Sequence, residues 1–214
     1  MRLRGNEMLF KKIYDMIEVI YFLLKLNFCW ILFTLLGIGI FGVVPATIAL
    51  YDCLRMRFIK GYELPVFENF KKSYDSHFKI GNKIGIVFFS ILVVLAIERS
   101  IIFSMGEFTG GVWIEIMIKI FQLVFSLFLL MFFPTFVHFK LHKTKIFLQP
   151  LIFLFIFPKE TLILALITLV TFWLYVFFPI LFFVLGLALP AYGVMAVMMV
   201  KYKKVEQHFI YTQS

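Results

Sequence analysis

The chain has 214 residues, of which 63% are hydrophobic and 15% charged, with a mean hydropathy of +1.00 and a formal net charge of +9. Soluble domains carry about 45–50% apolar and about 25% charged residues, so this chain has too little polar surface to coat a water-soluble particle. The composition therefore excludes a soluble globular protein. It predicts an all-α, polytopic transmembrane helix bundle, embedded in the lipid bilayer as one integral membrane domain over residues 1–214.

The basic residues are concentrated in four zones separated by apolar stretches. All but two of the 21 Lys and Arg residues lie in residues 1–25, 52–83, 139–159 and 201–204. The other two, Arg99 and Lys119, flank a loop at 104–112 that has no basic residue. Because cytoplasmic loops are enriched in Lys and Arg, we expect the four zones and both termini to face the cytoplasm. Membrane topology accounts for the net charge, and no nucleic-acid partner is expected.

Six apolar segments predict three hairpins in chain order. Their approximate bounds are 15–40, 45–59, 85–104, 112–139, 161–179 and 181–200. A helix rises about 1.5 Å per residue and a bilayer core is about 30 Å thick, so both limbs of the middle hairpin are long enough to cross. The stretches 45–59 and 190–200 are too short to cross unaided, and half-crossing or tilted helices are expected there. Five or six membrane segments are therefore predicted.

Glycine and proline mark the bends of the first and third hairpins. In the first, Gly37 and Gly42 precede Pro45, which can occupy the first turn of the returning helix. In the third, the bend is expected near Pro179 or between Gly186 and the following Pro-Ala. The two Pro-Ala stretches are similar, which leaves open a parallel internal repeat or chance likeness. One long first crossing with the N-terminus outside is the alternative to the first hairpin, but it would strand basic residues on the outer face.

Two segments between the hairpins are expected to lie along the cytoplasmic surface of the membrane. In the first, 65–79, four aromatic residues recur at helical spacing while lysines occupy other faces. The second, 146–157, is apolar but too short to cross, and it is expected to be either interfacial or re-entrant. One interpretation is that both segments line the membrane, and the other is that they dock to a second membrane protein. The docking face would then comprise Phe67, Phe70, Tyr74 and Phe78.

Four charged residues near the outer end of the middle hairpin are candidates for polar chemistry inside the membrane. They are Glu98, Arg99, Glu115 and Lys119. Charges at membrane depth are costly and often functional. Glu115 and Lys119 are spaced i,i+4 with the acid first, which favours an ion pair. One interpretation is pairing or snorkelling that fixes the hairpin, a second is a polar recess for a sugar or an ion, and a third is contact with a partner.

No set of residues predicts catalysis, cofactor binding or a metal centre. The sequence lacks the phosphate-binding, dinucleotide-binding, nucleophile-elbow and zinc-protease motifs. His138 and His142 have the spacing of helical metal ligands, but lysines surround them and no carboxylate is near in sequence. Cys29 and Cys53 lack CxxC spacing and are expected to be reduced packing residues. We therefore expect a protein that is not an enzyme and has no cofactor.

Residues 30–74 carry a family resemblance in the run WILFTLLGIGIFGVVPATIALYDCLRMRFIKGYELPVFENFKKSY. This pattern resembles the YesL-like family of bacterial integral membrane proteins, a domain of unknown function. The resemblance implies about five or six membrane segments and an accessory role beside carbohydrate uptake and polysaccharide-utilisation systems, with no established catalytic residues. The motif residues are Trp30, Gly37, Gly42, Pro45, Ala46, Thr47, Pro65 and Phe67.

Two classes of function remain. The favoured one is a non-enzymatic accessory or scaffold component that associates with a membrane permease of a carbohydrate-uptake system in the bacterial plasma membrane. The alternative is a small autonomous transporter or channel whose polar path is lined by the four charged residues of the middle hairpin. The sequence favours no particular substrate or oligomeric state.

Overall fold

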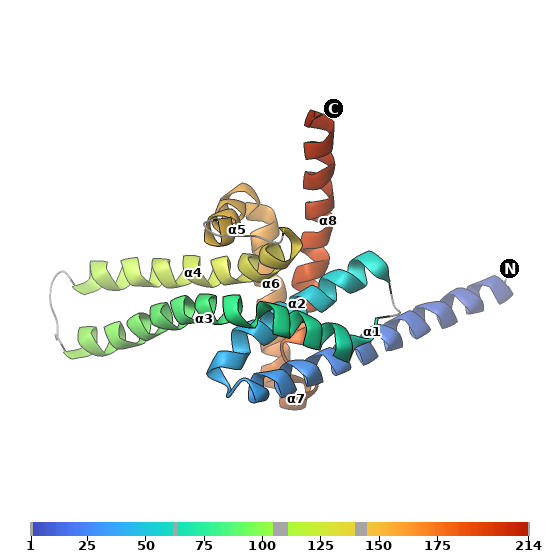
Figure 1. The fold of residues 1–214 in the computed structure, drawn as a ribbon, viewed down its shortest axis with the longest axis horizontal. Coiled ribbons are helices and arrows are strands. Elements are labelled where there is room, and N and C mark those ends of the chain that lie inside the picture. The colour runs from blue at the N-terminus through green and yellow to red at the C-terminus, as the bar shows by residue number, and fades with distance from the viewer. Residues whose placement is uncertain (1, 62–63, 105–110, 140–144, 214) are drawn as a thin grey trace.

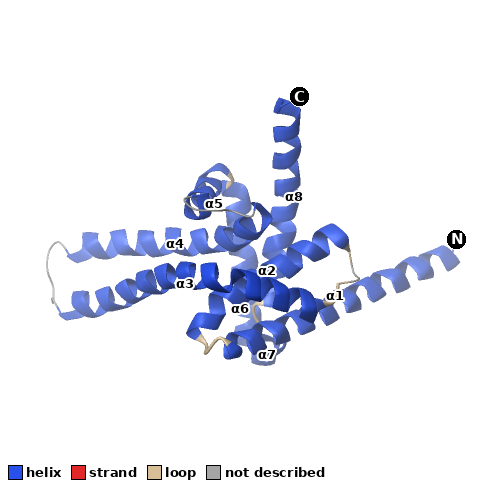
Figure 2. Cartoon of the chain, viewed as in Figure 1, coloured by secondary structure: helices blue, strands red, loops and turns tan. Residues whose placement is uncertain are grey.

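The computed structural model describes residues 2–61, 64–104, 111–139 and 145–213, and these ranges are helical almost throughout (Figure 2). Within them, eight helices follow in chain order: α1 (Arg2–Leu36), α2 (Ile40–Lys60), α3 (Val66–Ser104), α4 (Gly111–Phe139), α5 (Lys145–Ile156), α6 (Pro158–Phe177), α7 (Pro179–Leu185) and α8 (Ala188–Gln213). The helices α1, α3, α4 and α6 are long and apolar enough to cross a membrane, and the bent pair α7–α8 adds a fifth span if it counts as one. The predicted all-α polytopic bundle is confirmed.

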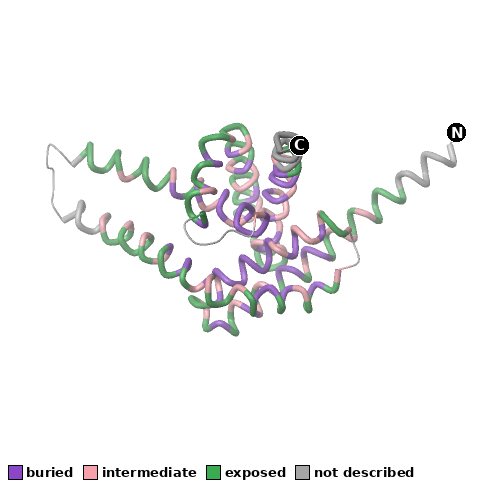
Figure 3. The backbone as a smooth tube through the Cα atoms, turned by 45° about the horizontal axis from the view of Figure 1, so that its top comes forward, coloured by how far each residue is buried: buried purple, intermediate pink, exposed green. Residues whose placement is uncertain are grey.

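The centre of the bundle is α2, which contacts α1, α3, α4 and α8. Several of its buried residues are small, including Gly42, Ala46 and Ala49. Small side chains let neighbouring backbones approach closely, which is how helices associate where lipid supplies no hydrophobic driving force. Figure 3 shows the buried residues gathered where the helices meet and the exposed ones along the projecting ends.

The predicted bounds of the second segment are wrong, because α2 begins at Ile40 and Pro45 lies inside it instead of in its first turn. Gly39 makes the turn, with a φ of 68° that glycine adopts without strain. The N–H groups of Gly42 and Val43 both donate to the Gly39 carbonyl, so the helix starts there. The first segment, expected at 15–40, ends correspondingly earlier, with α1.

The helix α3 is continuous over 39 residues. The predicted separation into an interfacial helix at 65–79 and a membrane segment at 85–104 is therefore wrong. Glycines in the intervening stretch are packing positions and not a break. A Cβ atom on Gly81 would lie 3.0 Å from Pro45 Cγ, so the absence of a side chain lets α3 lie directly against α2.

The C-terminal helices agree more closely with the predicted segments. The helix α4 matches 112–139, and the short helix α5 matches 146–157 and packs against α4 and α6. The third hairpin bends at both expected places. The chain leaves helical geometry at Phe178, and α7 and α8 meet at a 65° bend beside Gly186.

The hairpin formed by α3 and α4 projects from the rest of the molecule, on the left of Figure 1. The N-terminal end of α1 extends to the opposite side, and α8 runs toward the top of the same view. The helices therefore cross at the centre and diverge outward. The motif of residues 30–74 lies at the crossing, in α1, α2 and the first part of α3.

Candidate functional site

The motif residues of α1 and α2 hold these two helices together. The Trp30 indole Nε1–H donates to Thr47 Oγ1 over 3.1 Å, and the Thr47 hydroxyl donates to the Val43 carbonyl over 2.7 Å. A Cβ atom on Gly37 would lie 2.4 Å from the Cα of Gly42, so both glycines are required by the close approach of the turn. Pro45 and Ala46 are buried in α2, and Pro45 lies against Gly81 of α3. The motif residues of α1 and α2 therefore act through packing and through the hydrogen bond between Trp30 and Thr47.

The remaining motif residues begin α3 and join it to α1. The Pro65 carbonyl accepts hydrogen bonds from the backbone N–H and the side-chain amide of Asn69, at 3.1 and 2.9 Å. The ring of Phe33 on α1 then meets three aromatic rings of α3. Its centroid lies 5.8 Å from that of Phe67, 5.2 Å from Phe70 and 5.0 Å from Tyr74.

The predicted docking face is divided by this contact. Phe70 and Tyr74 are 0% and 7% exposed and belong to the core of the protein. Phe67 and Phe78 are 52% and 37% exposed and remain accessible. Helical spacing had placed all four on one face, but that face lies against α1, and the two residues at its centre are covered.

A hollow of about 390 Å³ lies beside Phe67, between α1 and the start of α3, and we call it the Phe67 hollow. Its lining residues are Lys25, Phe28, Cys29, Pro65, Val66, Phe67 and Glu68. Phe28 is 66% exposed, so two accessible aromatic rings from different helices contribute to one surface. One cation and one carboxylate accompany them. Such a surface can accept an apolar side chain next to a charged group of either sign.

Sequence reasoning missed a polar cluster between α2 and α3. Ser73 Oγ donates to Asp52 Oδ2 over 2.9 Å, and Arg55 Nη1 lies 3.8 Å from Asp52 Oδ1. His77 Nδ1 lies 2.8 Å from the Ser73 carbonyl oxygen. Ser73 Oγ also lies 3.3 Å from His77 Nδ1, but that nitrogen donates to the Ser73 carbonyl and cannot accept the hydroxyl proton. A nucleophilic triad needs the serine hydroxyl to donate to histidine, whereas here it donates to the carboxylate. The cluster therefore clamps α2 to α3. The signal for it was Asp52, an acid within an otherwise small and apolar run.

The predicted charged residues of the middle hairpin are only partly brought together. Glu115 Oε1 and Lys119 Nζ form the ion pair that their spacing predicts, at 2.5 Å. Their side chains are 48% and 69% exposed, so the pair lies on an outer face of α4. Glu98 is half-buried near the end of α3. The side chain of Arg99 lies outside the described residues, and the recess for a sugar or an ion stays a prediction.

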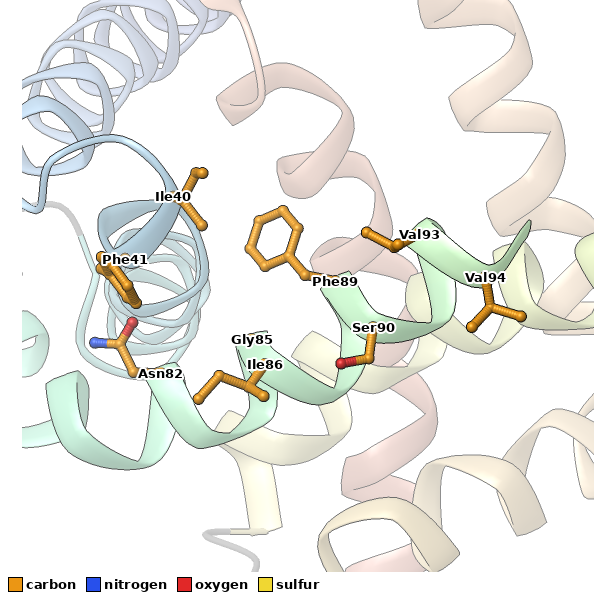
Figure 4. A pocket seen from close by; sticks show the side chains of 9 residues that line it. All are labelled: Ile40, Phe41, Asn82, Gly85, Ile86, Phe89, Ser90, Val93 and Val94. Carbon is orange, nitrogen blue, oxygen red and sulfur yellow. The ribbon is translucent and has the colours of Figure 1, made fainter. Parts of the chain in front are cut away.

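A second hollow, of about 450 Å³, lies between the start of α2 and the middle of α3 (Figure 4). Its walls are mostly apolar, with Asn82 and Ser90 as the polar residues. The Asn82 amide already donates to the Phe78 carbonyl over 3.0 Å. The apolar lining of this hollow therefore suits an apolar chain. Its lining residues are Ile40, Phe41, Asn82, Gly85, Ile86, Phe89, Ser90, Val93 and Val94.

The histidines and cysteines considered in the sequence do not form a metal-binding group among the described residues. Among the described residues, no group of three or more His, Cys, Asp or Glu side chains is arranged to hold a metal ion. His138 is buried with its ring 4.6 Å from that of Tyr202, and His142 lies outside the described residues. Cys29 and Cys53 are free and buried.

Comparison with known proteins gives a family match that covers α2 and parts of α1 and α3. Residues 23–99 match the family described as "Protein of unknown function, DUF624". The chain is 31% identical over 183 residues to the uncharacterized protein YteU of Bacillus subtilis (strain 168), which covers 85% of this chain and 81% of YteU. This chain belongs to the DUF624 family. The matched residues include the C-terminal part of α1 from residue 23, all of α2 and most of α3, so the family match coincides with the tightly packed helices around α2.

Two further members of the family in Bacillus subtilis (strain 168) are similar to this chain. The uncharacterized protein YesL is 27% identical over 140 residues, 65% of each chain, which confirms the YesL-like resemblance. The uncharacterized protein YesV is 30% identical over 128 residues, 60% of this chain and 61% of YesV. No solved structure matches the chain.

Proposed function

We propose that this DUF624 protein is a non-enzymatic accessory or scaffold component of a carbohydrate-uptake system, bound to a membrane permease in the bacterial plasma membrane. The observation that carries the docking role is the Phe67 hollow, where accessible aromatic rings from α1 and α3 lie beside Lys25 and Glu68. Aromatic anchors are typical of the centres of protein interfaces, and charged groups such as Lys25 and Glu68 are typical of the rim around them. The link with carbohydrate uptake comes from the resemblance to YesL-like proteins.

The polar side chains in the centre of the bundle form hydrogen bonds between helices, and this supports the proposed scaffold role. Thr47 bonds Trp30 and Asp52 bonds Ser73, so these polar side chains of α2 join helices to one another. Polar groups in a transport path or a catalytic site are instead directed at a ligand. The exposed surface available to a partner is mostly apolar and aromatic, and helices in membranes associate through such packing.

The basic residues near the hollow support a cytoplasmic position for it. The last turn of α2 carries Arg57 and Lys60, and α3 begins a few residues later, at the hollow. By the positive-inside bias this end of the bundle, together with both termini, lies at the cytoplasmic face. The permease would then contact the protein at the cytoplasmic side of the membrane.

The proposal is tested by affinity purification of the full chain from its native host in mild detergent, with mass spectrometry of what stays bound. We expect a stoichiometric permease with the unmodified protein. The substitution Phe67→Ser should lower its recovery by about tenfold or more, because an aromatic anchor is lost from the interface. Since Phe67 is 52% exposed, the amount of folded protein should not change.

The matched control is Phe78→Ser, which alters an accessible phenylalanine of the same helix that does not line the hollow. Permease recovery should be retained with this variant. Equal loss with both variants, or retention with both, would show that the hollow is not the docking surface. Purification of the unmodified chain as a clean homomer would overturn the accessory role itself.

A further inference from the structure

The hollow between the start of α2 and the middle of α3 lies where α3 changes from charged to uncharged sequence (Figure 4). From Lys71 to Lys83, α3 carries four lysines and one aspartate, whereas residues 84–97 contain no charged side chain. In a helix that crosses a membrane, such a boundary lies at the level of the lipid headgroups, because lysine side chains reach the polar layer from there. The hollow therefore begins at the headgroup level and continues into the hydrocarbon.

The length and the lining of this hollow suit a single acyl chain. On α3 the lining runs from Asn82 to Val94, which at about 1.5 Å per residue is about 18 Å of helix. One leaflet of a bilayer core is about 15 Å thick, so the hollow matches the depth of one leaflet. The facing wall is formed by Ile40 and Phe41 of α2, which are 63% and 53% exposed. The hollow is therefore open to the surrounding lipid.

Close backbone packing fixes the shape of the hollow. A Cβ atom on Gly81 would lie 3.0 Å from Pro45 Cγ, and one on Gly85 would lie 3.3 Å from Val44 Cγ2, so the start of α2 is held directly against α3. The helix α2 begins at Ile40, and α3 extends past it, which leaves a step between the two helices. A preformed step of this kind can accept a chain without rearrangement of the protein.

Two lysines lie at the headgroup end of the hollow. Lys79 and Lys83 precede the lining residues Asn82 and Ile86 by one helical turn each, so they share a face of α3 with the lining. Both lysines are exposed, and neither forms an ion pair among the described residues. The acid of this stretch, Asp75, lies a further turn away from the hollow. A negatively charged group at this end would therefore meet two positive charges.

We propose that this hollow binds an anionic phospholipid, with one acyl chain along the apolar walls and the phosphate beside Lys79 and Lys83. Each lysine near a membrane surface raises the affinity for anionic lipid by about fivefold. A zwitterionic phospholipid lacks the net charge that the lysines attract, and a soluble phosphate compound lacks the chain that fills the apolar walls. The site is separate from the Phe67 hollow, with which it shares no lining residue.

The test is native mass spectrometry of the full chain in detergent micelles titrated with dioleoylphosphatidylglycerol or dioleoylphosphatidylcholine, which carry the same acyl chains. We expect one phosphatidylglycerol molecule per chain, retained about tenfold more tightly than phosphatidylcholine. Glycerol 3-phosphate, which has an anionic group and no acyl chain, should not compete at the same concentration. Equal affinity for the two lipids, or competition by glycerol 3-phosphate as strong as that by phosphatidylglycerol, would overturn the proposal.

Removal of the two lysines tests the headgroup end of the site. The double substitution Lys79→Gln and Lys83→Gln should reduce the preference for phosphatidylglycerol to about twofold or less. The matched control is Lys71→Gln with Lys72→Gln, which removes the same charge from the same helix, farther from the hollow. The control should keep a preference of about fivefold or more. Equal loss with both pairs would indicate a general attraction to a basic helix and would overturn the proposal.

Filling the hollow tests the acyl-chain end. The substitution Ile86→Trp, at a lining residue that is 60% exposed, should abolish the retention of phosphatidylglycerol. The matched control is Ile97→Trp on the same helix, which is 52% exposed and does not line the hollow. Val93→Phe also fills the hollow and serves if Ile86→Trp does not fold. Unchanged lipid retention by a folded filling variant, or a dimer that Ile86→Trp dissociates, would overturn the proposal.

Discussion

The central helix α2 contains charged residues and is buried, whereas the projecting end of the α3–α4 hairpin is mostly apolar and is exposed. The helix α2 carries Asp52 and three basic residues and falls outside the candidate spans, yet four neighbouring helices cover it. The outer part of α4 is mostly apolar, but Trp113 and Met117 are 72% and 73% exposed. In a membrane protein, high hydropathy therefore marks contact with lipid, while small residues mark contact between helices.

The largest effect that this comparison predicts is at Gly42. A Cβ atom there would lie 2.3 Å from the Thr34 carbonyl oxygen, which is backbone and cannot move aside cheaply. Gly42→Val should therefore destabilise the fold by about 3 kcal/mol or more, or prevent folding, as overpacking does in a tight core. The change in the free energy of unfolding is measured by equilibrium unfolding in mixed detergent micelles.

The control for that variant is Val94→Ala in α3, at a position that is 65% exposed on the projecting hairpin. Its expected effect is within about 0.5 kcal/mol, as for other exposed substitutions. Comparable destabilisation by the two variants would contradict the division between a tightly packed centre and a loosely packed hairpin.

A smaller effect is expected for the hydrogen bond between Trp30 and Thr47. The substitutions Trp30→Phe and Thr47→Val, alone and together, form a double-mutant cycle. We expect a coupling free energy of about 0.6–1 kcal/mol, the usual size for a hydrogen bond between membrane helices. Additive effects would show that the motif residues stabilise α1 against α2 through packing alone.

The smallest effect is expected for the ion pair on the hairpin. Lys119→Met removes a partner of Glu115, and both side chains are largely exposed. The free energy of unfolding should change by less than about 0.5 kcal/mol, because exposed ion pairs contribute little. A loss of 2 kcal/mol or more (on the scale of a buried, unpaired charge) would place this pair inside an interface that the isolated chain does not show.

The family and the helical class follow from the sequence, because hydropathy, length and a specific motif decide them. The continuity of α3 does not, because the amphipathic stretch 65–79 and the apolar stretch 85–104 have different patterns in the sequence. Only the structure shows that one helix continues through both, with Gly81 packed on Pro45 between them. The contacts of Asp52 with Ser73 and of Asn27 with Phe183 join residues 21 and 156 positions apart. No local sequence pattern predicts how two helices are aligned along each other, and this alignment decides which distant residues meet.

The length of α3 has a mechanical consequence. Its 39 residues extend about 58 Å at about 1.5 Å per residue, nearly twice the thickness of a bilayer core of about 30 Å. Gly81 rests on Pro45 and divides the helix into arms of about 23 and 35 Å. The shorter arm is held to α2 through Ser73 and Asp52 and to α1 through Phe33, whereas the longer arm extends beyond these contacts. Spin labels at positions 67 and 97, each measured against α2, should therefore give a narrower distance distribution at 67 than at 97, and equal widths would show that the contacts do not hold the shorter arm.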